Sequence, residues 1–375
     1  MAHKVEIKII QDKNDRKSFV ELPWFIYKND PNWIPPLLSD MHNTLNPNKN
    51  ALLRLGPSCF FLAFYNGKLA GRIGAGMDLR LNKVKSEDMG YITLFESIEK
   101  YPVAEALFKI ALEWLKEKGA VYASGPQSPS NGDDYRGLLI EGFDSPPVLL
   151  NSYNPAYYVS YFERYGFEKH FDRFAYYYDL TKESPIRLAR GVELAKKRFA
   201  FHVRAIDLHN MEQEMQVIKK VVEEAMPDWP DMIPPSDEEI AAEADKLKQL
   251  AVSELILFIE NSENQCLGFA VTLPDYNQVL SRLNGRLFPI GFLKYFWYKR
   301  KINGVRMFVL FVTPKGRRRG VSAALYHYTM QNARRLGYQF GEGSTIHEFN
   351  QRMNIDAQKA GGRLYKKYRV YRIDL

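Results

Sequence analysis

The chain has 375 residues, of which 46% are hydrophobic and 14% aromatic, and its formal net charge is +8 at pH 7. This length predicts two domains, and the hydrophobic content excludes an intrinsically disordered chain. The two cysteines, Cys59 and Cys266, are far apart and outside any metal-binding spacing. They exclude a disulfide framework and a zinc site, and they indicate a reducing compartment.

The sequence indicates neither a signal peptide nor a membrane-spanning helix. The N-terminus passes directly into an alternating strand pattern without an apolar signal core. The most lipid-like stretch, residues 288–298, contains Lys294 and is much shorter than the ~20 residues that a spanning helix needs. We therefore expect a cytoplasmic protein with no transmembrane segment and no bound metal.

Strand and helix patterns alternate in the first half of the chain. Asn66-Gly67 joins two apolar runs as a hairpin, Pro102 begins a helix, and Gly166 ends another. In chain order we predict a strand at 5–10, a helix at 19–27, a hairpin at 59–78, a helix at 102–119, a strand at 120–126, a helix ending at 166, and a strand or hairpin to 180.

The second half repeats this order of elements. In chain order we predict a strand at 201–207, a helix at 211–225, a proline-rich loop at 227–239, a hairpin at 254–275, an aromatic basic stretch at 288–301, a buried strand at 305–313, a helix at 321–337, a strand at 338–346, a helix at 350–359 and a final strand at 364–373. The repetition predicts a duplicated α/β unit, with a first domain at 1–180, a linker at 181–200 and a second domain at 201–375.

A basic turn stands between strand 305–313, whose apolar run is typical of a strand covered on both faces, and helix 321–337. The interval 276–341 has no acidic residue and thirteen basic ones, so positive charge is concentrated there. Three arginines at 317–319 precede Gly320 at the start of the helix. Free N–H groups at a helix N-terminus, a glycine that permits close approach and nearby arginines together favour a phosphate. The turn lacks the sequence features of a nucleoside-triphosphate loop and of a Rossmann fingerprint.

Residues 317–322, Arg-Arg-Arg-Gly-Val-Ser, resemble the pyrophosphate loop of the GNAT acyltransferases, R/Q-x-x-G-x-G/A, with Ser322 in the last small position. Asn350 and the stretch 357–371 are similar to the closing helix and final strands of that family. The resemblance spans residues 200–375. It implies an α/β fold with mixed sheets, in which two tandem GNAT-like domains each have a twisted, mostly antiparallel sheet flanked by helices.

The resemblance also implies a binding site for a cosubstrate, acetyl-CoA or a longer acyl-CoA. In the family, the pantetheine arm lies between two splayed strands and the pyrophosphate lies on the loop amides. Carried over, Phe311, Val312 and Thr313 would line the pantetheine, and Asn350 would lie near the thiol. The residues that would hold the pyrophosphate are Arg317, Arg318, Arg319, Gly320, Val321, Ser322 and Ala323.

The first half resembles a degenerate copy of the same domain. Asn154, Tyr161 and Gly166-Phe167 are similar to the family's closing motif. Where the basic loop should stand, Glu96 and Glu99 would repel a pyrophosphate, and no glycine permits close approach. We expect that this domain has lost cofactor binding and now shapes or covers the substrate site.

Three acidic or imidazole side chains are candidates for a general base. Glu342 lies between two glycines in the predicted strand 338–346, and His347 and Glu348 follow directly after that strand. For His347 and Glu348, the alternative interpretation is an ordinary polar loop without a catalytic role. These three residues are the catalytic candidates that the sequence offers.

The sequence leaves the general acid open. The tyrosine that many family members use would fall near Ile355 or Asp356, so only Tyr365 or Tyr368 are substitutes. The turn-rich loop 124–137 contains Asp133, Asp134 and Tyr135, which are candidates for contact with an amine substrate, although a structural loop is the simpler interpretation.

For the aromatic basic stretch 288–301, we predict an amphipathic helix packed between the two halves of the chain. A lid that holds an acyl chain and a helix on a membrane surface are the alternatives.

The resemblance implies an acyltransferase that moves an acyl group from acyl-CoA to an amine of a small molecule or peptide. Two other donors are alternatives, namely an acyl carrier protein, whose acidic surface would suit the basic residues, and an aminoacyl-tRNA. A non-catalytic module that binds acyl-CoA or nucleic acid is a further alternative. Nucleic acid is disfavoured, because the basic residues are mixed with buried strand positions rather than gathered along one polar helix.

Overall fold

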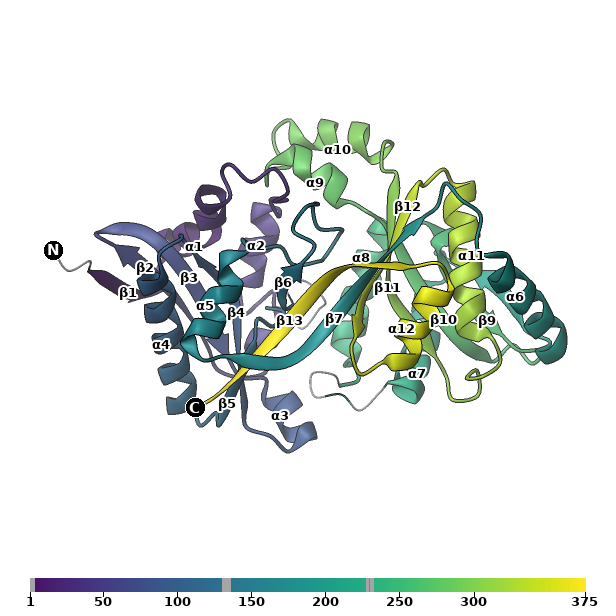
Figure 1. Cartoon of the computed structure of the whole chain (residues 1–375), viewed down its shortest axis with the longest axis horizontal. Coiled ribbons are helices and arrows are strands. Elements are labelled where there is room, and N and C mark those ends of the chain that lie inside the picture. The colour runs from purple at the N-terminus through teal and green to yellow at the C-terminus, as the bar shows by residue number, and fades with distance from the viewer. Residues whose placement is uncertain (1–3, 130–135, 227–228, 230–232) are drawn as a thin grey trace. The chain divides into compact units, whose positions relative to one another are not determined.

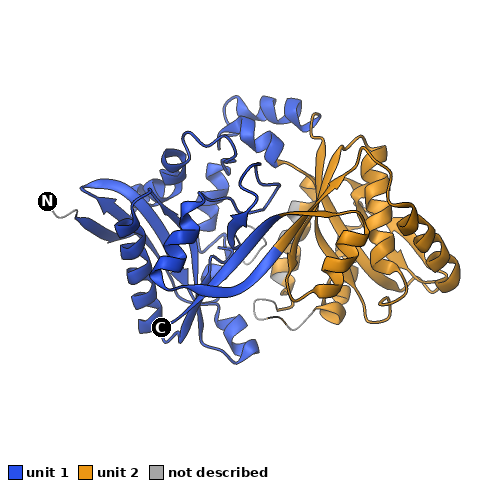
Figure 2. Cartoon of the chain, viewed as in Figure 1, with its two compact units in different colours: residues 1–173, 277–300, 366–375 blue, residues 174–276, 301–365 orange. Residues whose placement is uncertain are grey.

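The computed structural model describes residues 4–129, 136–226, 229 and 233–375, which form a mixed α/β fold (Figure 1). Asp133, Asp134 and Tyr135 lie outside the described residues. The chain forms two compact units (Figure 2): unit 1 consists of residues 1–173, 277–300 and 366–375, and unit 2 of 174–276 and 301–365. The predicted domain boundaries stay a prediction, because compactness and sequence duplication are different criteria.

Unit 1 contains a sheet with the strand order β1-β2-β3-β4-β5-β13, and β6 pairs with β13. Only the β4–β5 pair is parallel among the pairs described in this unit. The hairpin predicted at Asn66-Gly67 is confirmed: both residues have positive φ, 51° and 75°, as a tight two-residue turn requires. The strands are β1 Val5–Ile9, β2 Ser58–Tyr65, β3 Lys68–Gly76, β4 Met89–Ser97, β5 Tyr122–Gly125, β6 Leu138–Glu141 and β13 Arg363–Asp374, of which residues 363–365 belong to unit 2.

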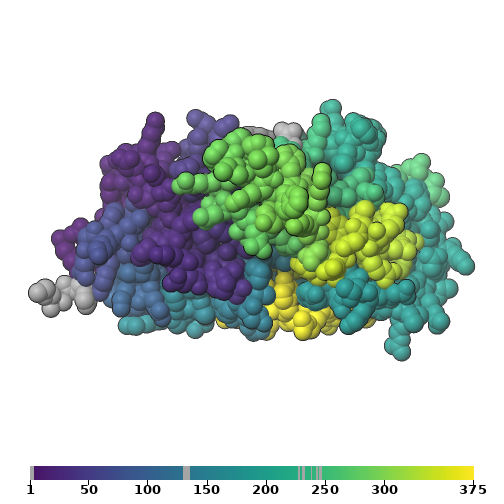
Figure 3. All heavy atoms as spheres, turned by 90° about the horizontal axis from the view of Figure 1, so that it is seen from above, coloured from purple at the N-terminus to yellow at the C-terminus, as the bar shows by residue number. Residues whose placement is uncertain are grey.

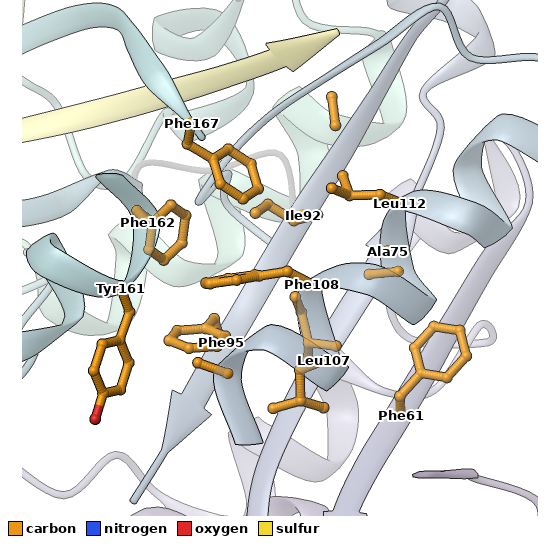
Figure 4. Close-up of a cluster of buried hydrophobic side chains, with 14 of the residues drawn as sticks. Phe61, Ala75, Ile92, Phe95, Leu107, Phe108, Leu112, Tyr161, Phe162 and Phe167 are labelled. Carbon is orange, nitrogen blue, oxygen red and sulfur yellow. The ribbon is translucent and has the colours of Figure 1, made fainter. Parts of the chain in front are cut away.

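Helix α4 covers the sheet of unit 1 and supplies the centre of its core (Figure 4). The Phe108 ring lies 4.7 Å from the ring centroids of both Phe95 and Phe162, and 5.2 Å from that of Phe167. The helices of unit 1 are α1 Lys13–Ile26, α2 Leu38–Thr44, the 3-10 helix Ala51–Arg54, α3 Leu79–Lys85, α4 Tyr101–Glu117, α5 Tyr157–Tyr165, α9 Asn277–Leu283 and α10 Gly291–Lys299.

Unit 2 repeats this arrangement, with the strand order β12-β11-β10-β9-β8 and a parallel β11–β12 pair. The strands are β8 His202–Ala205, β9 Ile256–Glu260, β10 Cys266–Pro274, β11 Gly304–Val312 and β12 Phe340–His347, and β7 Glu168–Asp179 contributes residues to both units. The helices are α6 Ile186–Phe199, α7 Met211–Ala225, α8 Asp237–Leu250, the 3-10 helix Ser253–Leu255, α11 Val321–Arg335 and α12 Gln351–Lys359.

The structure confirms the prediction of a helix at 211–225. The predicted linker 181–200 contains α6, whose Val192 is fully buried in the core of unit 2.

Two expectations about burial differ from the structure. Strand β11 is buried only at residues 304–307, and residues 308–312 are half-buried, so the prediction of cover on both faces is wrong for its second half. For the stretch 288–301 we predicted an amphipathic helix packed between the two halves of the chain, but Phe292, Leu293, Phe296 and Trp297 of α10 are exposed, so this apolar face is not packed as predicted. The sequence showed an apolar face but did not show which face of the helix points to solvent.

Candidate functional site

Strands β11 and β12 separate after four ladder pairs. Their parallel pairing joins residues 304–307 to residues 340–343, whereas β11 continues to Val312 and β12 to His347. In the described part of the chain, no ladder pair joins the two strands beyond Met307 and Gly343. Backbone groups of two diverging strands are therefore available to an extended ligand that adds to the sheet as a strand would.

A β-bulge in β11 stands at the point of separation. On the β10 side, Val271 pairs with Val309 but Thr272 pairs with Met307, so Phe308 is the extra residue. A bulge bends its strand and increases the local twist, which accounts for the departure of β11 from β12. The bulge therefore positions the half-buried end of β11, which contains the predicted pantetheine residues Phe311 and Val312.

Thr313 anchors the turn that follows β11. It is buried, its backbone N–H donates to the Leu267 carbonyl at 2.9 Å, and its hydroxyl donates to the same oxygen at 3.0 Å. The Gly316 N–H in turn donates to the Thr313 carbonyl at 2.9 Å. Because the Thr313 hydroxyl is engaged in this contact, its side chain holds the turn against β10.

The N-terminus of α11 has the geometry of an anion site. Gly320 takes φ 78° immediately before the helix, and no side chain in the described part of the chain caps it. The first N–H groups of any α-helix lack an intrahelical partner, and here they belong to Val321, Ser322 and Ala323. The Ser322 hydroxyl donates to Asp356 at 2.7 Å, so Ser322 offers its backbone N–H rather than its side chain.

The three arginines of the turn surround this N-terminus with positive charge, and all three are exposed. Arg317 reaches the Ala225 carbonyl at 3.5 Å, and the Arg319 guanidinium lies 5.8 Å from the centroid of the Phe199 ring. Arg318 takes φ 61°. Fixed positive charge, uncapped N–H groups and a glycine in the left-handed region are the three features that fit a diphosphate.

A buried polar cluster lies where β11 and β12 are still paired. Arg306 is fully buried, its Nε donates to the Ser344 hydroxyl at 2.8 Å, and the same Nε lies 4.0 Å from Oε1 of Glu342. The Ser344 hydroxyl and the Tyr365 hydroxyl both donate to the Glu342 carboxylate. The structure thus brings the candidate base Glu342 together with Tyr365, one of the two substitutes for the general acid.

Sequence reasoning missed Arg306 and Ser344. One signal was present, namely a single arginine inside the apolar run of β11. A charge at such a position requires a buried partner, because a buried unpaired charge is very costly.

His347 and Glu348 lie at the end of β12, beyond the separation of the strands. His347 is buried, its ring stacks on Trp229 at 4.9 Å between centroids, and its Nδ1 accepts the Phe349 N–H at 3.2 Å. Glu348 is half-buried. These contacts hold the His347 ring at the strand end, five residues along the chain from Glu342.

Asn350 is the N-cap of α12, because its side-chain oxygen accepts the Met353 N–H at 3.1 Å. A second asparagine was missed: the Asn354 amide donates to the His347 carbonyl at 3.1 Å, and its oxygen accepts the Tyr176 hydroxyl at 3.0 Å. The two asparagines therefore fix the start of α12 against the end of β12.

Unit 1 also has a short parallel strand pair, β4–β5, but its carboxylate Glu96 has different surroundings from Glu342. Its parallel pair β4–β5 joins only residues 89–91 to 122–124, and β4 also has an irregular register against β3. Glu96 accepts hydroxyl hydrogen bonds from Tyr27 at 2.9 Å and Tyr158 at 2.8 Å, and it lies 3.6 Å from Arg72. Burial raises the pKa of Glu96, and Arg72 partly offsets that effect. Glu96 is thus part of an internal network.

No protein-family model matches the chain. Two curated proteins are similar to nearly all of it. Bacterial ceramide synthase from Caulobacter vibrioides is 31% identical over 363 residues, which cover 95% of this chain and 94% of that protein. Protein YghO from Escherichia coli strain K12 is 31% identical over 379 residues, which cover 97% and 94%.

Among solved structures, a tandem GNAT protein from the clavulanic acid biosynthesis pathway has a TM-score of 0.58 at 9% identity, over 99% of this chain and 98% of that one. At this identity the likeness shows a shared fold.

Proposed function

We propose that the chain, which belongs to the family that contains bacterial ceramide synthase and Protein YghO and shares the fold of a tandem GNAT protein, transfers an acyl group from acyl-CoA to an amine. One observation carries this proposal: strands β11 and β12 separate and lead into an uncapped helix N-terminus surrounded by arginines. An acyl carrier protein and an aminoacyl-tRNA are the competing donors, and the experiment below distinguishes them.

In this proposal the donor is held by most of the residues that the resemblance indicated, whereas the side chains of Thr313 and Asn350 are engaged in structural hydrogen bonds. The N–H groups of Val321, Ser322 and Ala323, with the arginines at 317–319, hold the diphosphate. Backbone groups on the β12 side of β11, where no described ladder pair follows Met307, hold the arm that carries the thioester beside Phe311 and Val312. Binding along a fixed strand edge places the thioester near the amine, and such proximity supplies much of the rate of acyl transfer.

The transfer forms a bond from the acceptor nitrogen to the acyl carbon and breaks the bond from that carbon to sulfur. The acceptor ammonium loses two protons, one of which ends on the coenzyme A thiol. We assign the acceptance of the other proton to Glu342, because it is the carboxylate nearest the point of strand separation. Its side chain is fully buried, so the half-buried Tyr365 hydroxyl relays the proton.

Arg306 and Ser344 are positioning residues in this scheme. Both contact the Glu342 carboxylate or lie next to it, and neither needs to touch the reacting atoms. The substitutions Glu342→Gln and Glu348→Gln distinguish these two carboxylates as the base.

A relative named bacterial ceramide synthase makes a long-chain amine of the sphingoid type the first acceptor to test. Small-molecule and peptide amines follow as further acceptors. For the donor, a panel from acetyl-CoA to long-chain acyl-CoA measures the preferred chain length.

Titration calorimetry with coenzyme A and acyl-CoA tests the donor. We expect binding to the native chain and a loss of affinity of at least about tenfold in Arg318→Glu, because a negative charge replaces a positive one beside the diphosphate. Arg335→Glu is the matched control: it makes the same charge change at the opposite, C-terminal end of α11 and should leave the affinity nearly unchanged.

Equal losses in Arg318→Glu and Arg335→Glu would contradict the assignment of the turn. Steeply salt-dependent binding of tRNA without any binding of coenzyme A would favour an aminoacyl-tRNA donor. Activity with an acylated carrier protein but not with acyl-CoA would favour an acyl carrier protein as the donor.

A further inference from the structure

Helix α10 and the residues just before it present a group of large apolar side chains to solvent. Phe292 is 41% exposed, Leu293 59%, Phe296 63% and Trp297 64%, and Phe288 and Ile290 just before α10 are more exposed than Phe292. In Figure 3 this segment, coloured green, lies on the face turned toward the viewer. Exposed apolar patches of this kind mark binding surfaces in soluble domains. None of the described helices is both long and apolar enough to cross a membrane.

The exposed residues form one face of α10. A helix advances roughly 100° per residue, so Phe292, Leu293, Phe296 and Trp297 fall within an arc of about 140°. On the same helical projection, Lys294 borders this arc beyond Trp297, and Lys299 borders it beyond Phe292. An apolar face with a lysine at each edge is typical of a helix that lies in a lipid–water interface.

The charge of the whole segment has one sign. Residues 277–300 contain no acidic residue. Its basic residues are all exposed, and they are Arg282, Arg286, Lys294, Lys299 and Arg300. Anionic lipid headgroups attract such a group of cations, whereas the same segment of a second copy of this chain would repel it.

The segment is firmly attached to unit 1. The Asn277 side chain donates to the Pro147 carbonyl at 2.8 Å, and the Trp24 indole N–H donates to the Asn284 side chain at 2.9 Å. Gly285 takes φ +77°, and a Cβ there would lie 2.4 Å from the Trp24 ring. The apolar face is therefore presented on an ordered base, which fits a permanent docking surface better than a lid.

We propose that α9 and α10 dock the protein on a bilayer of anionic phospholipid, with the aromatic face of α10 in the interface and the basic residues among the headgroups. This proposal does not depend on the acyl donor or on the catalytic residues. It assigns the aromatic basic stretch to a membrane surface, one of the alternatives that the sequence left open.

Vesicle co-sedimentation of the full chain tests the proposal. We expect binding to vesicles of equal parts phosphatidylcholine and phosphatidylglycerol, and much weaker binding to pure phosphatidylcholine. The double variant Phe296→Gln/Trp297→Gln should lose vesicle affinity by at least about tenfold, because two aromatic side chains no longer enter the interface. Lys294→Glu/Lys299→Glu should lose affinity only for the anionic vesicles.

Replacing an exposed leucine outside α10 is the control for replacing one within it. Leu293→Gln should weaken binding, whereas Leu79→Gln, on α3 with 51% exposure, should not. In Figure 1, α3 lies at the edge of unit 1 away from α9 and α10. A direct readout of insertion is also available: a blue shift of tryptophan fluorescence on anionic vesicles should disappear in Trp297→Phe, which keeps its aromatic ring and its binding.

Three results would overturn the proposal. The first is no binding to the anionic vesicles, and the second is equal binding by native protein and the Phe296→Gln/Trp297→Gln variant. The third is a native oligomer that becomes a monomer in that variant, since the face would then be an interface between copies of this chain.

Discussion

Arg306 and Glu342 are opposite one another in the parallel β11–β12 ladder, one pair before the strands separate. Both side chains are almost completely buried, and Nε of Arg306 lies 4.0 Å from Oε1 of Glu342. A buried carboxylate requires a nearby cation and several hydrogen-bond donors. Arg306 supplies the cation, and the hydroxyl groups of Ser344 and Tyr365 donate to the Glu342 carboxylate. The pair therefore links the stability of unit 2 to the proposed chemistry.

The stability of unit 2 should depend on keeping this pair together. Arg306→Leu leaves the Glu342 carboxylate buried without its cation, and we expect a loss of about 3–5 kcal/mol in the free energy of unfolding. The double variant Arg306→Leu/Glu342→Leu removes both charges, so it should be more stable than Arg306→Leu alone. Urea denaturation measures both values, and additive losses in the double variant would refute the coupling.

Activity should depend on Glu342 and Tyr365 as one unit. Glu342→Gln keeps the shape of the side chain but removes its basicity, so we expect kcat to fall at least about 100-fold while coenzyme A still binds. Tyr365→Phe should cause a similar loss, and the double variant little more, since the two residues relay the same proton. Steady-state kinetics with acyl-CoA measure these losses.

A neighbouring tyrosine provides the control for Tyr365. The Tyr177 ring lies 5.9 Å from the Tyr365 ring, and Tyr177→Phe should leave kcat nearly unchanged. A large loss in Glu348→Gln combined with full activity in Glu342→Gln would instead assign the base to the end of β12.

The local elements of the fold were predictable because their signals are local. Asn66-Gly67 has the turn chemistry of a hairpin, and the helix at 211–225 has both the periodicity and the predicted bounds. The basic turn was also visible, since three consecutive arginines precede a glycine at the start of a helix. Each of these signals lies within a few residues of the structure that it predicts.

The remainder of the site depends on contacts between distant residues. Arg306 and Glu342 are 36 residues apart in the chain and meet only through the register of two parallel strands. The bulge at Phe308 depends on the alignment of β11 with β10, which no local pattern specifies. The exposed face of α10 likewise depends on which side of the helix meets unit 1.

Gly320 should be sensitive to any side chain. Its φ is 78°, and an added Cβ would lie 2.7 Å from the Ala195 Cβ of α6. We expect Gly320→Ala to destabilise the protein by about 1–2 kcal/mol and to weaken acyl-CoA binding, because the turn must shift. Gly337→Ala is the matched control: φ there is 91°, but nothing lies within 4 Å of the added Cβ. It should cost stability through backbone strain alone and leave the affinity unchanged.

Thr272 should tolerate the loss of its hydroxyl. Its side chain is fully buried, and its Oγ1 has no hydrogen-bond partner among the described residues. It lines a small cavity together with Met307, Tyr326 and Thr329. Thr272→Val replaces an unsatisfied hydroxyl with a methyl group of the same shape, so we expect a gain of about 1 kcal/mol. A lower melting temperature in this variant would show that the hydroxyl is satisfied in solution.

The Asp172–Arg369 pair should make the free energy of unfolding of unit 1 depend on pH in the acid range. Nε and Nη2 of Arg369 donate to the two oxygens of Asp172 at 2.8 and 3.1 Å, and Lys169 lies 3.2 Å away. Burial raises the pKa of Asp172, but the hydrogen bonds and charges of Arg369 and Lys169 outweigh it, so the net pKa falls below the usual 3.8. A carboxyl group whose folded pKa is lowered stabilises the fold above its unfolded pKa, and that contribution disappears as pH falls through the folded pKa.

Asp172→Asn should therefore cost about 1 kcal/mol at pH 7 and progressively less below the unfolded pKa near 4. Urea denaturation of both proteins between pH 7 and pH 3 measures the difference. A difference between the two proteins that stays constant over this range would show that the charge of Asp172 contributes nothing, and that the cost of the substitution lies in packing alone.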